Sequence, residues 1–304
     1  MDASDFHSPR KLSEFKGSRA LLAPNPEVVV IFAHGFDGDP EKTWVNFQYL
    51  VDKLGDKYSL WKKCDLFFFS YVSRPQITPL AETFIKFVRF VFDRGRTSDP
   101  DPLPSGTQFH TMGQKANYRA VILVGHSTGG PIIREAVLQI AEPLAKAGVI
   151  LTAVTAAEPG TTHSFETSFL NSSLRFFAPA DIGVIGAGKL GYARSVPVLR
   201  TLANLYLARN QLYQNLKPGG PLLTRIQHET ERLYKKFPSV PAFAALSLFG
   251  SDEEIVIVDV YQHEQPTKLP TVPGHSHVSI CKPTLEYTTP LEFVTDALQR
   301  STSK

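Results

Sequence analysis

The sequence predicts an α/β fold, in which helices cover both faces of a mostly parallel sheet. Two observations lead to this prediction. Short apolar runs without polar alternation recur along the chain, a pattern typical of strands that are buried on both faces. Between them lie longer segments whose apolar residues recur every three or four positions, which indicates amphipathic helices. An alternation of such strands and helices is characteristic of parallel sheets.

Five apolar runs are the predicted strands. The first three, VVVIFA, DLFFFSY and AVILV, consist mainly of the β-branched and aromatic residues that suit a half-buried or buried strand. Two further runs follow later in the chain. The predicted strands are Val28–Ala33, Asp65–Tyr71, Ala120–Val124, Val149–Val154 and Ala242–Phe249.

Four segments have the spacing of helices. The second of them is entered at Pro79, and proline suits the first turn of a helix because its missing N–H has no partner there in any case. The last would close the fold near the C-terminus. The predicted helices are Thr43–Leu54, Pro79–Phe92, Pro131–Leu144 and Leu291–Leu298.

Two long segments interrupt this alternation. Thr97–Lys115 is rich in Pro, Gly, Asp and Ser and is predicted to be a surface loop. Residues 158–236 are interpreted as a helical cap inserted over the edge of the sheet, with a core over 27–157 and 237–304 and an N-terminal extension over 1–26. Most of the apolar residues of this segment are expected to be ordinary core residues. They are Phe165, Phe169, Phe176, Phe177, Leu199, Leu202, Leu205, Leu212 and Leu216.

The composition narrows the class of protein. The chain has 304 residues, of which 42% are hydrophobic, and a formal net charge of +3. Its basic residues are scattered, so no nucleic-acid partner is expected, while weak contact with an anionic membrane is compatible with the charge. No apolar stretch approaches the length of about 18 residues that a transmembrane helix requires, and no signal peptide is apparent. We expect a cytoplasmic protein, of unknown oligomeric state, without a bound metal or cofactor.

The two cysteines, Cys64 and Cys281, are isolated in the sequence. Isolated cysteines are usually small buried apolar residues, and a disulfide between these two is the less favoured interpretation.

The segment Gly125-His126-Ser127-Thr128-Gly129-Gly130 carries the strongest chemical signal. A serine nucleophile must be raised above the surface of the sheet, and a sharp turn from a strand into a helix does this. Glycines two residues before and two residues after the serine relieve the crowding in that turn. Because a predicted strand precedes the motif and a predicted helix follows it, we assign Ser127 as a nucleophile on an α/β-hydrolase fold.

Such a nucleophile needs donors for the oxyanion that forms when it attacks a carbonyl. In this fold they are the backbone amide after the nucleophile and an amide from an early strand-to-helix loop. The predicted donors are therefore the amides of Thr128 and Phe36, and Gly35 and Gly38 would let the early loop come close. His34, in the same loop, is expected to be structural and held by hydrogen bonds.

The general base must be a histidine late in the chain, because the order of the triad in this fold is serine, acid, histidine. The candidates are His263, His275 and His277, and we favour His277, which lies in the segment Gly274–Pro283 just before the last predicted helix. The acid should follow the strand that ends at Phe249. Candidates there are Asp252, Glu253, Glu254 and Asp259, with Glu253 favoured and Asp252 next.

Three segments resemble a known group of proteins. IFAHGFDGDPEKTW, GHSTGG and HVSICKP are together similar to segments of lipase-like α/β hydrolases, nearest to the group of the GPI inositol-deacylases and the serine-active-site lipase-like proteins. The resemblance covers roughly residues 27–157 and 241–283 and leaves out the predicted cap. It implies hydrolysis of esters, often of lipids, without a cofactor, with Ser127 as nucleophile and His277 as base. Glu253 would replace the commoner aspartate.

Two other classes of function are weighed against this one. Gly186-Ala187-Gly188-Lys189-Leu190-Gly191 matches a dinucleotide-binding pattern, and Gly183–Lys189 matches most of a phosphate-binding loop. Leu190, however, stands where that loop needs a Ser or Thr to bind magnesium. No apolar strand precedes it, so a flexible turn is the better interpretation. A non-catalytic binding module on a hydrolase fold is the second alternative. Within the enzyme class, small-molecule or lipid esters, thioesters and amides all suit the same residues.

Overall fold

The structure is a computed structural model that describes residues 10–12, 14–23, 25–47, 59–73, 75–93, 118–149, 164–185, 210–265 and 270–302. In this part of the chain eight strands form one sheet, in the order β1-β2-β4-β3-β5-β6-β7-β8. The strands are β1 (Arg10–Lys11), β2 (Arg19–Leu21), β3 (Val28–Ala33), β4 (Cys64–Phe69), β5 (Ala120–His126), β6 (Ser173–Phe177), β7 (Ala245–Asp252) and β8 (Thr271–Ser276).

The sheet is mostly parallel. Strands β4, β3, β5, β6, β7 and β8 run in one direction, whereas β2 pairs antiparallel with β4 and β1 antiparallel with β2. Every residue of β3 and of β4 is buried, as an apolar run without alternation predicts. The order of the strands, together with the strand–turn–helix described below, confirms the predicted α/β-hydrolase fold.

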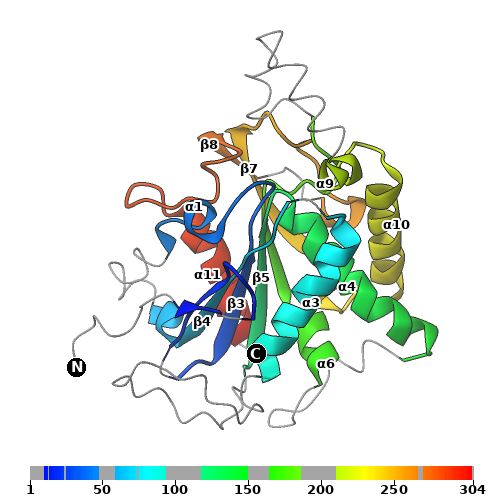
Figure 1. Cartoon of the computed structure of the whole chain (residues 1–304), viewed down its shortest axis with the longest axis horizontal. Coiled ribbons are helices and arrows are strands. Elements are labelled where there is room, and N and C mark those ends of the chain that lie inside the picture. Colours follow the sequence, from blue (N-terminus) through cyan, green and yellow to red (C-terminus); the bar gives the residue numbers. More distant parts are fainter. Residues whose placement is uncertain are drawn as a thin grey trace.

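Helices lie on both faces of the sheet (Figure 1). Helices α3 and α4 pack against each other on one face, and α10 packs on α4, while α11 contacts β5 and β6 from the opposite face. The α-helices are α1 (Pro40–Thr43), α3 (Ile77–Asp93), α4 (Gly129–Lys146), α6 (Phe165–Leu170), α9 (Gln211–Asn215), α10 (Pro221–Lys236) and α11 (Thr289–Thr302). Short 3-10 turns are η2 (Ser59–Lys63), η3 (Pro241–Phe243) and η4 (Gln262–Glu264).

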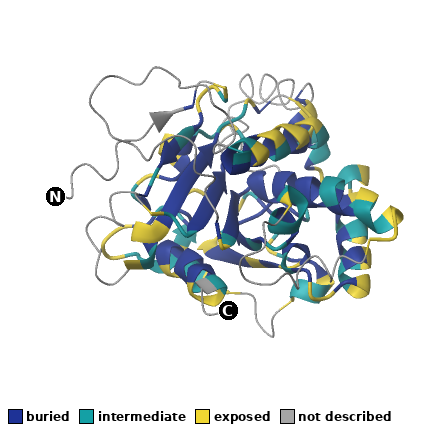
Figure 2. Ribbon diagram, turned by 90° about the horizontal axis from the view of Figure 1, so that it is seen from below, coloured by how far each residue is buried: buried dark blue, intermediate teal, exposed yellow. Residues whose placement is uncertain are grey.

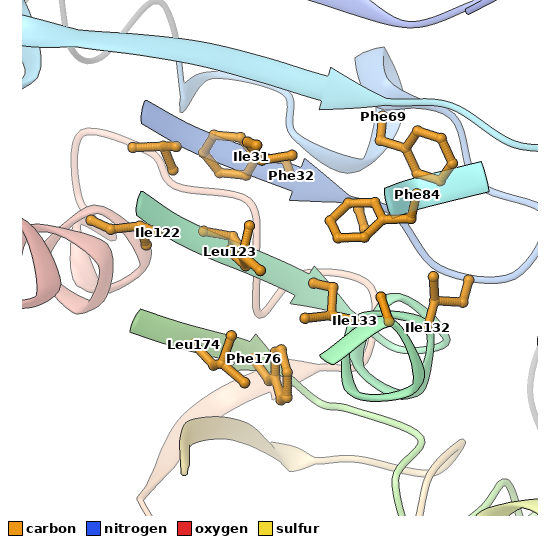
Figure 3. Packing of buried hydrophobic residues seen from close by; sticks show 14 of the residues in the cluster. Ile31, Phe32, Phe69, Phe84, Ile122, Leu123, Ile132, Ile133, Leu174 and Phe176 are labelled. Carbon is orange, nitrogen blue, oxygen red and sulfur yellow. The ribbon is translucent and has the colours of Figure 1, made fainter. Parts of the chain in front are cut away.

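The core fills the space between the sheet and its helices. Figure 2 shows buried strands in the middle and helices whose outer faces are exposed. Figure 3 shows part of this packing, in which Phe84 of α3 lies beside Phe69 of β4 and Ile133 of α4 lies near β5. A large apolar surface is thereby removed from water, and the sheet becomes a fixed base for the loops at its C-terminal edge.

The segment predicted as a cap contains a strand of the sheet. Residues Ser173–Phe177 form β6, which pairs in parallel with β5 and β7, and Phe176 and Phe177 are buried in the core. The sequence conceals this strand because Arg175 lies in its middle. That arginine is buried and donates to Asp296 and to the carbonyl of Phe293, both of α11.

Other parts of the predicted cap have mixed outcomes. Leu212 and Leu216 are buried, as expected for one helical face, and α10 covers α4. The glycine-rich segment 186–191 and Leu199, Leu202 and Leu205 lie outside the described residues. The division into core and cap over residues 158–163 and 186–209 therefore stays a prediction.

The first predicted helix, Thr43–Leu54, does not begin where we expected. Helix α1 ends at Thr43, and the chain turns at Asn46, whose φ of 71° lies in the left-handed region that ends helices. Residues 48–58 lie outside the described part of the chain. Trp44 and Phe47 are nevertheless buried, as their apolar spacing predicts.

The remaining differences concern strand bounds and edges. The strand predicted over Ala242–Phe249 begins three residues later, because Pro241–Phe243 forms the turn η3. Val149 is exposed and belongs to no strand, and the rest of its predicted strand is not described, nor is the loop 97–115. The predicted N-terminal extension supplies the edge strands β1 and β2.

Candidate active site

Ser127 lies in the sharp turn between β5 and α4. Its φ is 53°, a left-handed conformation that few residues other than glycine adopt. The surrounding backbone fixes this conformation, since the Ser127 amide donates to the carbonyl of Phe177 at 3.0 Å and its own carbonyl accepts from the amides of Gly130 and Ala180. A strained residue that its neighbours hold in place is typical of functional sites and of the nucleophile turn in this fold.

The glycines of the motif are required because the backbone of helix α4 lies very close to that of the strands. A Cβ on Gly125 would lie 2.9 Å from backbone atoms of Gly129 and Gly130, and a Cβ on Gly129 would overlap the carbonyl of Ala33 at the end of β3. Helix α4 can therefore begin directly against the strands only because these positions carry no side chain. This is the role that the sequence motif predicts for them.

The loop after β3 lies against the nucleophile turn. A Cβ on Gly35 would be 2.8 Å from the Cβ of Ser127, so the backbone next to Phe36 directly adjoins the serine. Thr128 is buried and precedes the first residue of α4. Within the described part of the chain, neither the Phe36 nor the Thr128 amide donates to another backbone group, which leaves both available to a bound oxyanion.

His34 holds this loop in place, as expected. Its Nδ1 donates to the Gly35 carbonyl at 2.8 Å, and its Nε2 accepts from the Tyr71 amide at 3.3 Å. The Tyr71 hydroxyl donates to the His34 carbonyl at 2.8 Å, and the two rings are stacked at 4.2 Å. Burial lowers the pKa of His34, so the imidazole is neutral and serves as a structural hydrogen-bonding group.

The structure brings His277 and Glu253 together. His277 Nδ1 lies 3.0 Å from Glu253 Oε2, and the side chains are 8% and 1% exposed. The second carboxylate oxygen, Oε1, accepts from the amides of Ile255 and Val256 at 2.8 and 3.0 Å. The loop after β7 thus holds the carboxylate rigidly, and the carboxylate in turn fixes the orientation of the imidazole.

The other candidate acids and bases are placed elsewhere. Asp252 is exposed and accepts from the hydroxyl of Ser251, and Glu254 is exposed as well. His275 stacks on Tyr287 at 3.6 Å, while His263 Nε2 donates to the Phe243 carbonyl at 2.8 Å. Asp259 accepts from the amide of Val260. Of the residues considered as acid or base, Glu253 and His277 are the pair in direct contact.

A hydrogen bond joins this pair to the nucleophile turn. His126, the residue before Ser127, donates from Nε2 to the carbonyl of His277 at 2.8 Å, and the two rings lie 4.8 Å apart. Sequence reasoning passed over His126 because the motif treats its position as variable. The available signal was a polar aromatic residue at the end of a strand that is otherwise apolar.

Strand β8 is a further feature of the site that the sequence did not reveal. It ends at the residue before His277. Its residues are mostly exposed and include Pro273 and Gly274, so no apolar run marks it in the sequence. Pairing with β7 ends at Asp252 and Ser276. The acid and the base therefore follow the ends of two neighbouring strands at the same edge of the sheet.

The described residues contain neither a metal site nor a helix that is long and apolar enough to cross a membrane. No cluster of three or more His, Cys, Asp or Glu residues there has the arrangement that a metal ion needs. Cys64 and Cys281 are buried and unpaired, as expected for isolated cysteines.

Comparisons with known proteins find similarity in the fold alone. No family model and no curated protein sequence matches the chain. Phospholipase PlaB from Legionella pneumophila is similar at 15% identity and a TM-score of 0.43, and the match covers 74% of this chain but 39% of the phospholipase. A mature lipase from Bacillus licheniformis is similar at 14% identity and a TM-score of 0.48, and the match covers 92% of this chain and 97% of the lipase. Est1E from Butyrivibrio proteoclasticus is similar at 16% identity and a TM-score of 0.45, and the match covers 98% of this chain and 99% of Est1E.

Proposed function

We propose that this protein is a serine hydrolase that cleaves carboxylic esters through an acyl-enzyme. The observation that carries the proposal is the buried contact between His277 and Glu253, bonded through His126 to the turn that holds Ser127. Because Nδ1 of His277 faces the carboxylate, Nε2 is left for the serine and the substrate. This division of the two nitrogens is what a base in a catalytic triad needs.

The proposed reaction has two steps. Ser127 Oγ attacks the ester carbonyl, His277 Nε2 takes the serine proton and gives it to the departing alcohol, and the acyl group remains on Ser127. A water molecule, deprotonated by His277, then attacks the acyl carbon, and the proton returns to Ser127 as the acid leaves. Glu253 stabilises the imidazolium, and the amides of Phe36 and Thr128 bind the oxyanion in both steps.

The placement of exposed apolar residues along the chain supports an apolar acyl group. Six of the eight exposed large apolar residues in the described chain lie in segments that follow the C-terminal ends of the parallel strands. These are the loops that surround a nucleophile at this edge of the sheet. The six residues are Val45, Val72, Ile185, Val258, Val278 and Leu285.

The finer assignments are part of this proposal. We propose a lipid or small-molecule ester as substrate, with thioesters and amides as alternatives that use the same chemistry. We also propose membership of the GPI inositol-deacylase group, which the three sequence motifs support, and peripheral contact with membranes, which the net charge of +3 supports. A cytoplasmic location is proposed as well.

The test is a panel of p-nitrophenyl esters of increasing acyl length. We expect turnover by the wild type and a loss of at least about 10³-fold in Ser127→Ala and His277→Ala, with unchanged thermal unfolding. Ser239→Ala, which changes an exposed serine after α10, is the matched control and should remain fully active. Full activity of Ser127→Ala would refute the assignment of the nucleophile.

A fluorophosphonate probe separates the enzyme from a non-catalytic binding module on the same fold. An activated serine attacks the phosphorus of the probe and becomes labelled, so we expect labelling of the wild type and none of Ser127→Ala. Absence of labelling in the folded wild type would favour the binding module.

A further inference from the structure

We propose that His126 is a positioning residue that holds the base His277 at a fixed distance from the nucleophile. This inference rests on the proposed function and concerns the bond from His126 Nε2 to the His277 carbonyl, 2.8 Å long and buried. His126 is joined covalently to Ser127, so one hydrogen bond links the nucleophile turn to the loop that carries the base. The two partners, at the end of β5 and in the loop after β8, are 151 residues apart in the sequence.

The direction of the bond fixes the tautomer of His126. A carbonyl oxygen can only accept, so the hydrogen of the neutral ring must be on Nε2 and Nδ1 must be bare. Nδ1 is buried and has no partner among the described residues. It faces the loop after β3, where a Cβ on Gly35 would lie 3.0 Å away. One nitrogen of this ring therefore makes a hydrogen bond and the other makes none.

The acceptor has few alternatives. His277 lies in a turn in which the amides of Ser279 and Ile280 donate to the Ser276 carbonyl, and no backbone amide of the described chain donates to the carbonyl of His277. A buried carbonyl without a partner costs free energy, so this turn depends on the imidazole of His126. Loss of the donor would free the loop to shift away from Ser127.

A neutral ring at this position also suits the chemistry. The rings of His126 and His277 are 4.8 Å apart, and His277 becomes positively charged in the proposed transition state. A second charge next to it would oppose that step. Burial, and then the neighbouring His277, lower the pKa of His126 well below its usual value, so His126 acts as a donor without carrying charge.

Two amide substitutions separate the roles of the two nitrogens. In His126→Gln the side-chain amide can take the place of Nε2 and donate to the His277 carbonyl, whereas in His126→Asn the amide is at the level of Nδ1. Both variants remove the ring from its edge-on contact with Trp44, at 6.4 Å between centroids. We therefore expect similar losses of thermal stability and different losses of activity.

The expected result is a split in kcat. His126→Gln should remain within about threefold of the wild type, and His126→Asn should lose roughly 10- to 100-fold in kcat with little change in KM, because displacement of a catalytic group by about 1 Å has effects of this size. The fluorophosphonate labelling rate should fall in parallel. Rates are compared well below the lower Tm, so that unfolding does not contribute.

A measurement on the wild type does not depend on the variants being folded. The imidazole nitrogen shifts of His126, assigned by their disappearance in His126→Gln or His126→Asn, should show a protonated Nε2 and a bare Nδ1 at neutral pH. The opposite tautomer would overturn the inference. So would equal labelling rates in the wild type and both variants. A folded wild type that does not label at all would overturn the proposed function, and the inference with it.

Discussion

Two buried carboxylate networks lie close to the nucleophile helix α4, and they differ in the partner that the carboxylates face. Glu253 faces His277, which can gain and lose a proton. Asp181 and Glu264 face Arg134 of α4. Arg134 Nε donates to Asp181 Oδ2 at 2.7 Å, and its Nη1 and Nη2 donate to the two carboxylate oxygens of Glu264 at 2.9 and 2.6 Å. Arginine stays charged in proteins, so only the first network can move protons.

The surroundings of the two networks fit this division. Every side chain of the arginine network is about 1% exposed, and Arg134 also lies over the ring of Tyr261 at 4.1 Å. Burial raises the pKa of Asp181 and the neighbouring Glu264 adds to this, while the guanidinium of Arg134 lowers it. The network connects α4, the loop after β6 and η4, and its role is structural.

The largest expected effect is on catalysis. Glu253→Gln keeps the shape of the side chain but replaces a carboxylate oxygen with an NH₂ group, which no longer stabilises the imidazolium or holds the correct tautomer. We expect kcat for p-nitrophenyl esters to fall by about 10³- to 10⁴-fold, with thermal unfolding little changed. A variant with nearly full kcat would remove Glu253 from the catalytic network and so erase the contrast.

The next effect is on stability and belongs to the other network. Arg134→Met leaves Asp181 and Glu264 buried without a counterion, and we expect a loss of about 3–5 kcal/mol in the free energy of unfolding. Urea denaturation measures it. Lys146→Ala is the control, because Lys146 is 77% exposed in its pair with Glu142 and its loss should cost less than about 0.5 kcal/mol. Equal effects of the two substitutions would show that the buried network is not structural.

A smaller effect is the dependence of stability on pH. The pKa values of His34 and His126 are both lowered, first of all by burial, so below about pH 6.5 the unfolded chain binds more protons than the folded one. Stability is therefore complete above that pH and falls as the pH drops, by at most about 1.4 kcal/mol per pH unit for each histidine.

Unfolding in urea at several pH values between 7.5 and 5.5 measures this slope. His126→Gln should give a shallower slope than the wild type, since it removes one of the two groups. A slope that is the same in both proteins would mean that His126 does not contribute.

The sequence predicted most of what apolar patterning and the glycine motif control. The strands β3, β4 and β5 and the turn at Ser127 follow from uninterrupted apolar runs and from glycines that only a close approach requires. Strand β6 was missed because Arg175 interrupts its run, and its partner Asp296 lies 121 residues later. A polar residue that is satisfied by a distant partner leaves no local signal.

The candidate site divides in the same way. The sequence favoured Glu253 and His277 but left Asp252 and His275 open, because neighbouring residues of similar chemistry cannot be separated without knowing where the chain turns. The structure separates them through the two amides that bind Glu253 Oε1 and through the ring of Tyr287 against His275. The bond of His126 to His277 spans 151 residues and was beyond the reach of motif reasoning.

The smallest expected effect tests the sharpest of these distinctions. Asp252 is adjacent to Glu253 in the sequence, but it is the last paired residue of β7. Its side chain is exposed and accepts from the Ser251 hydroxyl. Asp252→Asn keeps the size of the side chain and its acceptor oxygen. It removes only the charge of the carboxylate, which solvent screens well in the wild type. We expect kcat/KM to change by less than about twofold, as is usual for surface charges, measured beside Glu253→Gln on the same ester. A loss in Asp252→Asn as large as in Glu253→Gln would mean that the loop after β7 rearranges when substrate binds and that the two carboxylates share the role.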